Sequence, residues 1–113
     1  MSKFTLRQDP VTGQYLALAN PVTQSATVCQ RNVLALCVSS NLWQWRVAAR
    51  LLEDHSELSP EDSCRLTGFQ YADWQFDGED LICLVRVAWD GAHNFHDANR
   101  IAFLRVAGFR DLL

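Results

Sequence analysis

Apolar and polar residues alternate near the start of the chain, with the period of a β-strand. Phe4 and Leu6 are flanked by polar residues, and a second apolar run begins at Tyr15. Between the two runs, the stretch "DPVTG" supplies a proline and a glycine, residues that favour turns. The pattern therefore predicts a β-hairpin over residues 3–19.

The apolar run "VLALCV" at 33–38 fits a buried strand as well as a helix. Upstream, Asn20 can cap a helix that starts at Pro21. Since no glycine or proline follows Pro21 in this segment, we predict a helix over about 22–39 and keep a strand as the alternative.

The next segment, about 41–55, has the clearest helical spacing in the chain. Its apolar residues recur every three or four positions, at Leu42, Trp45, Ala49 and Leu52. The serines and asparagine just before them are suited to an N-cap, and Arg46 and Arg50 fall four apart on another face. We predict an amphipathic helix here.

A short helix and a second hairpin are predicted next. Ser59 followed by Pro60 is a typical helix start, and Gly68 would end that helix. The segment 69–89 is rich in aromatic and β-branched residues around an Asp-Gly pair, which favours a tight hairpin turn. Its second strand is apolar on both sides, so we expect it to lie centrally with both faces covered.

The last predicted helix covers about 93–107. Asn94 or Asp90 can serve as its N-cap, and Gly108 as its stop. The apolar stripe of that helix would consist of Phe95, Ala98, Ile101, Ala102 and Val106. The sequence thus predicts a single α+β domain over 1–113, with an antiparallel sheet of about four strands from the two hairpins and about three helices covering it.

His93 and His96 are the residues most suggestive of metal or acid–base chemistry, since three positions can place two imidazoles on one helical face. A zinc site needs further ligands, and Asp90 or His55 would have to approach through the fold. Because Asp97 suits the first turn of a capped helix, we interpret the cluster as a helix start. The four cysteines form no CxxC pair, and the usual catalytic motifs are absent, so no catalytic residue, metal or cofactor is predicted.

Charge and hydropathy argue against two classes of partner. The net charge is −3 and the ten basic residues are dispersed, which disfavours nucleic-acid binding. The apolar runs fall well short of the ~20 residues needed to span a bilayer, so no membrane partner is expected. The first ten residues hold no apolar signal region, and cysteines without an export signal indicate reduced thiols, so we expect a cytoplasmic protein.

Aromatic residues are more numerous than a core of this size requires, with four tryptophans and six phenylalanines in 113 residues. On the predicted helix, Trp43 points about 200° away from Trp45, so it either covers another element or is exposed for a partner. The chain ends with Phe109, Leu112 and Leu113, which either complete the core or dock on another chain.

These features lead to the hypothesis of a small regulatory or inhibitory protein that binds another protein, itself or both, a homodimer included. Trp43 and the apolar tail would fill pockets on the partner, with Arg46 and Arg50 at the rim. The alternative is a small-molecule-binding domain or small enzyme with a pocket near His93 and His96.

Overall fold

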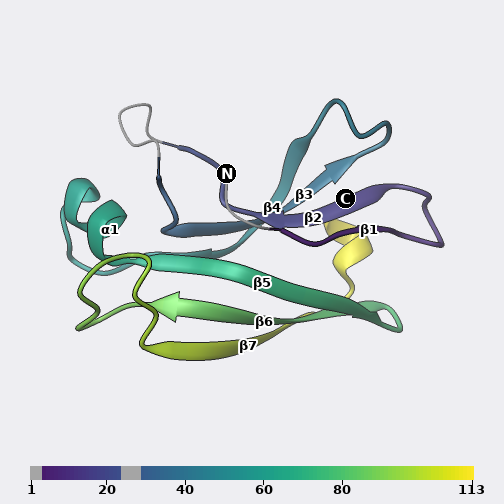
Figure 1. Ribbon diagram of the computed structural model, residues 1–113. Coiled ribbons are helices and arrows are strands. Elements are labelled where there is room, and N and C mark those ends of the chain that lie inside the picture. The colour runs from purple at the N-terminus through teal and green to yellow at the C-terminus, as the bar shows by residue number, and fades with distance from the viewer. Residues whose placement is uncertain (1–3, 24–28) are drawn as a thin grey trace.

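Two antiparallel sheets lie face to face in the computed structural model, which describes residues 4–23 and 29–113 (Figure 1). The first sheet has the order β1 (Leu6–Gln8), β2 (Tyr15–Ala19), β3 (Val33–Ser39), β4 (Arg46–Glu53). The second has the order β5 (Gly68–Asp77), β6 (Asp80–Ala88), β7 (Arg100–Val106). Helix α1 (Pro60–Leu66) connects the sheets, and the 3-10 helix η1 (Phe109–Leu112) follows β7. The predicted α+β fold with about three helices is therefore wrong, and the protein is mostly β.

A large–small alternation of side chains determines β2 and β3. The large residues of these strands point into the core: Leu16, Leu18, Leu34, Leu36 and Val38. The residues between them are small: Ala17, Ala19, Ala35 and Cys37. Because side chains alternate faces along a strand, this size pattern fits β structure and not the predicted helix over 22–39. Residues 24–28 of that predicted helix lie outside the described residues.

The predicted helix over 41–55 is also wrong, since this segment forms a turn followed by β4. Two shifts of register interrupt the pairing of β3 with β4, which is the geometry of β-bulges. Each bulge adds one residue and changes which face the following side chains occupy. Three apolar residues of β4 pack against the core: Ala48, Leu51 and Leu52. The two leucines follow Ala48 by three and four positions, which is also the spacing of residues on one face of a helix.

The two predicted hairpins and the short helix are present. β1 pairs with β2, and β5 pairs with β6 around the Asp-Gly turn, where Gly78 has φ +63°. The N-cap Ser59 accepts a hydrogen bond from the backbone N–H of Asp62 at 3.1 Å, with Pro60 at the first helical position. The expectation that β6 is covered on both faces is wrong, because Leu84 on its outer face is 54% exposed.

The segment predicted as a helix over 93–107 ends in a strand instead. Asn94 does act as a cap, because its Oδ1 accepts from the backbone N–H groups of His96 and Asp97 at 2.8 and 3.0 Å. The turn stops there, and β7 follows with a period of two. Its inward residues, Ala102, Leu104 and Val106, pack against the core, whereas those between them face solvent. The apolar residues of this segment fit both the helical period of 3.6 and the strand period of two, so their spacing alone does not distinguish a helix from a strand.

Polar contacts hold the two sheets together at both ends of the shared core. The side-chain amide of Asn20 donates to the carbonyls of Val33 and Phe69, both at 2.7 Å, which joins β3 to β5. At the other end, the fully buried Asp9 carboxylate accepts two hydrogen bonds from Arg110, at 2.7 and 3.0 Å. Arg110 also pairs with Glu79 at 2.8 Å. The β1–β2 turn, the β5–β6 turn and η1 are thereby tied together.

The Arg110 guanidinium, together with hydrogen bonds from Thr12 and Val11, holds the pKa of Asp9 well below its usual range. A carboxylate with a depressed pKa in the folded state stabilises that state above the pKa of the unfolded chain, near 3.9, and loses this contribution as the pH falls.

We expect Asp9→Asn to lower the free energy of unfolding by about 3 kcal/mol at pH 7, since one partner of a buried ion pair is removed. The difference between wild type and variant should shrink by about 1 kcal/mol at pH 3, where the unfolded carboxyl is protonated. Urea denaturation at both pH values measures this. Asp73→Asn, at an exposed carboxylate 4.0 Å from Arg7, is the control and should change little. An equal loss of unfolding free energy in Asp9→Asn at both pH values would contradict the lowered pKa of Asp9 in the folded state.

Candidate functional site

Side-chain hydrogen bonds order the β3–β4 turn from within. The hydroxyl oxygen of Ser39 accepts from the backbone N–H groups of Asn41 and Leu42, at 3.2 and 2.9 Å. Asn41 Oδ1 in turn accepts from the backbone N–H groups of Trp43 and Gln44, both at 2.9 Å. Serine and asparagine side chains that bond the backbone two or three residues ahead are a common means of fixing a turn. Four successive backbone donors are thus satisfied without a helix.

This turn presents a tryptophan to solvent. Trp43 is 90% exposed, the largest fraction among the large hydrophobic residues of the described chain. The neighbouring Leu42 is 46% exposed and has φ +68°, a left-handed conformation that is unfavourable for a side chain with a Cβ. The indole N–H of Trp45 donates to the carbonyl of Leu42 at 2.9 Å and helps to hold this conformation. We call residues 39–45 the tryptophan turn, and Figure 1 shows it projecting beyond the body of the two sheets.

An apolar groove of about 390 Å³ begins beside the tryptophan turn, on the outer face of the first sheet. Its floor includes the small residues Ala17, Ala19 and Cys37, and Trp45 forms one wall. The remaining residues that line it are Phe4, Asn20, Pro21 and Val22. Burial raises the pKa of the Cys37 thiol, so this residue is a neutral part of the floor and not a thiolate nucleophile at neutral pH.

The two arginines predicted as rim residues are both exposed on β4. Arg46 is the first residue of the strand and directly follows the tryptophan turn, three positions after Trp43. Arg50 lies further along the strand and pairs with Glu53 at 2.6 Å. Only Arg46 is therefore placed beside the turn with no ion pair of its own among the described residues.

The predicted tail residues divide between the core and the surface. Phe109 is fully buried and stacks on Phe76 of β5, with ring centroids 5.6 Å apart. Leu113 also packs against the core, and only Leu112, at 40% exposure, presents substantial apolar area to solvent. Of the two predicted alternatives, Phe109 completes the core, and it is not accessible to a partner.

The histidines near the opening of β7 do not converge on a common site. His93 Nδ1 lies 3.2 Å from Asp97 Oδ2, and the His93 side chain is 87% exposed. His96 Nε2 instead lies 3.4 Å from the Tyr71 hydroxyl. The described side chains contain no group of three or more histidine, cysteine, aspartate or glutamate residues that could hold a metal ion. A cavity of about 460 Å³ is lined by Asp90, Gly91 and Ala92, directly before His93. Since the two histidines contact different side chains, a ligand pocket near them stays a prediction.

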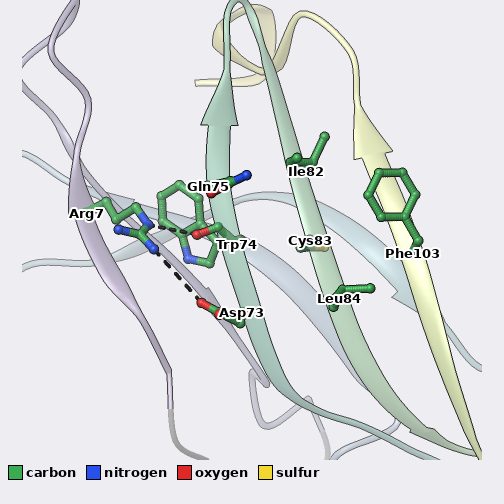
Figure 2. Close-up of a pocket in the computed structure, with 8 residues that line it drawn as sticks. All are labelled: Arg7, Asp73, Trp74, Gln75, Ile82, Cys83, Leu84 and Phe103. Atoms are coloured by element: carbon green, nitrogen blue, oxygen red, sulfur yellow. Dashed lines mark hydrogen bonds and ion pairs between the residues drawn. The ribbon is translucent and has the colours of Figure 1, made fainter.

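A second exposed apolar surface was missed in the sequence. It covers the outer face of β6 and β7, where Leu84, Ile101 and Phe103 are 54, 72 and 61% exposed. Figure 2 shows Leu84 and Ile82 beside Phe103 on neighbouring strands, with Asp73 on β5 and Arg7 of β1 beyond it. The alternation in "RIAFLRV" was a signal for it, but this stretch was assigned to a helix and β6 was expected to be covered on both faces.

No family model, no curated protein and no solved structure matches this chain. Within the described residues, no helix has the length and apolar character needed to cross a membrane. The described chain has two exposed apolar surfaces that bear on function, the tryptophan turn with its groove and the outer face of β6 and β7.

Replacing Leu42 with asparagine should raise the free energy of unfolding by about 1 kcal/mol, because asparagine tolerates the left-handed backbone that strains leucine. Thermal denaturation measures this as a rise of several degrees in Tm. Leu58→Asn is the matched control, since Leu58 is 41% exposed and is not among the left-handed residues of the described chain. A gain of the same size in both variants would contradict the strain at Leu42.

Proposed function

We propose that this protein is a non-enzymatic regulatory or inhibitory module that acts by binding another protein through the tryptophan turn. The observation that carries the proposal is the 90% exposure of Trp43 on a turn whose backbone is fixed by Ser39 and Asn41. Tryptophan is enriched among the residues that dominate binding energy at protein interfaces. Such a residue held out in water on an ordered turn suits a binding anchor better than a structural role.

Preorganisation supports the same proposal. A flexible loop loses conformational entropy when it binds, which weakens the complex. The tryptophan turn is already ordered in the folded protein, because the side chains of Ser39, Asn41 and Trp45 hold its backbone, so it loses little conformational entropy on binding. Leu42 is kept in a strained conformation in the process. Strain that persists on an exposed turn is typical of functional sites.

The partner's contact surface is proposed from the surroundings of Trp43. The indole ring would enter an apolar pocket of the partner, and Arg46 would contribute a hydrogen-bonding rim. The groove beside Trp45 has room for an apolar side chain offered in return. The mild net charge of −3 disfavours a nucleic acid as the partner.

A cytoplasmic location belongs to the same proposal. No disulfide joins any of the four cysteines in the described residues, and two of them, Cys64 and Cys83, are buried. Free cysteines are usual in reducing compartments, whereas exported proteins of this size commonly use disulfides. Burial raises the pKa of Cys83 to about 11, so this thiol is unreactive inside the core.

The test is affinity capture from extract of the source organism, treated with nuclease, using the intact chain and Trp43→Ala as baits. We expect one protein to be retained by the intact chain, and its affinity for Trp43→Ala to fall at least about 30-fold, the equivalent of about 2 kcal/mol. Val11→Ala is the matched control, since Val11 is 69% exposed on a different turn.

Two outcomes of this experiment count against the proposal. The first is a partner that binds Trp43→Ala as tightly as the intact chain, because the anchor would then lie elsewhere. The second is recovery of only the chain itself with all baits. The contribution of the tail is tested with Leu112→Ala, because a chain ending at Gly108 would lose the buried Phe109 and unfold.

A further inference from the structure

We propose that two copies of this chain pair edge to edge along β7, which joins their three-stranded sheets into one antiparallel sheet across a two-fold axis. The proposed self-association uses β6 and β7 and not the tryptophan turn, so it is independent of the function proposed above. Three observations support the proposal. The edge of β7 is unprotected, exposed apolar residues lie beside that edge, and one pairing register brings these apolar residues of the two copies together.

The four sheet edges differ in how well they are protected. β1 is only three residues long, and β4 carries two register shifts, which are features that hinder pairing with another strand. The edge of β5 is blocked at Trp74, whose carbonyl accepts a hydrogen bond from Arg7 Nε at 2.8 Å. β7 is seven residues long, pairs with β6 without a register shift and has no strand on its other side in the described chain.

Apolar side chains stand next to this open edge. Leu84 of β6 lies directly opposite Phe103 of β7, and Ile101 follows on the same face. Together the three expose roughly 350 Å² per copy, if their full areas are near those of large side chains. Edge-to-edge pairing covers only part of this area, because Leu84 lies one strand further from the edge. The apolar contact is therefore well under half of the ~800 Å² that each partner buries in a standard interface, and the backbone edge adds to it. The expected complex is a reversible dimer.

Symmetry limits the register of the pairing. In an antiparallel pair related by a two-fold axis, one residue must face its own copy. If Ala102 faces itself, Ile101 of one copy faces Phe103 of the other, which is an aromatic–β-branched pair of the kind that stabilises sheets. If Phe103 faces itself, Arg105 is placed opposite Ile101. The first register brings apolar residues together, so we choose it.

The charges of β7 are compatible with this register. Arg105 is already held by Asp77 and Asp80 of its own chain, at 2.6 and 2.7 Å. The Arg100 guanidinium lies 4.8 Å from the ring centroid of Trp89. With Ala102 at the axis, Arg100 faces Leu104 of the other copy, so no two arginines are opposed. Since the other edges are short, bulged or blocked, pairing closes at two copies and does not continue into a filament.

Sedimentation velocity of the intact chain over about 1–100 µM tests the proposal. We expect the mass to rise with concentration from 12.8 kDa towards twice that value. Phe103→Lys should raise the dissociation constant at least tenfold, because it places a charge opposite the apolar Ile101 of the other copy. Val11→Lys carries the same charge change at an apolar residue that is 69% exposed in the β1–β2 turn, compared with 61% for Phe103, and should dimerise normally. Trp43→Ala should also dimerise normally, which separates this result from partner binding.

A charge-complementation experiment distinguishes loss of the interface from loss of folding. The acidic variant Ile101→Glu/Phe103→Glu and the basic variant Ile101→Lys/Phe103→Lys should each be monomeric alone. Mixed in equal amounts, they should form a heterodimer, because every glutamate then faces a lysine. The proposal is overturned by a wild-type chain that stays monomeric at about 100 µM, by a Phe103→Lys variant that dimerises normally, or by a mixture that stays monomeric.

Discussion

The buried pair of Asp9 and Arg110 is the contact on which the joining of the two sheets most depends. The two residues are 101 positions apart in the chain, and their bidentate hydrogen bonds bring the first turn of the first sheet to the residues that follow the last strand. A carboxylate with no solvent exposure is stable only when every lone pair finds a donor. Asp9 meets this condition with Arg110, Thr12 and Val11. The apolar core fills the space between the sheets, and Asn20 closes its other end.

The local parts of this fold could be predicted from the sequence, but the arrangement of the sheets could not. A turn with proline and glycine, an Asp-Gly pair and a serine cap each act within a few residues, so both hairpins and α1 were found. The predicted helices failed where the apolar spacing was ambiguous. Two bulges in β4 give its inward residues a nearly helical spacing, and Asn94 caps a turn that does not continue. In β2 and β3 the regular alternation of large leucines and small alanines indicates a strand. An apolar–polar pattern does not show this alternation, because both residues count as apolar.

The candidate surfaces were predictable to different degrees. Trp43 was expected to point away from the core on a helix, and it does face solvent, although on a turn. Phe109 could not be assigned to core or surface, because this depended on whether the last residues fold back between the sheets. The apolar face of β6 and β7 was missed for a related reason. A strand that is apolar on both sides indicates cover on both sides only if the rest of the chain is long enough to provide it, and here the second face is left open.

The small residues on the floor of the groove lie on the face of their strand that points away from the core. Ala17 and Ala19 share their strand with Leu16 and Leu18, but they lie on the opposite face, so their side chains take no part in the packing between the sheets. A change of volume at the partly buried Ala19 would alter the depth of the groove while the core stayed filled, whereas Ala17, at 3% exposure, leaves less room for a larger side chain. Single substitutions can therefore change the shape of this face at little cost to the fold. This is possible because residues that face the groove alternate along the strand with residues that face the core.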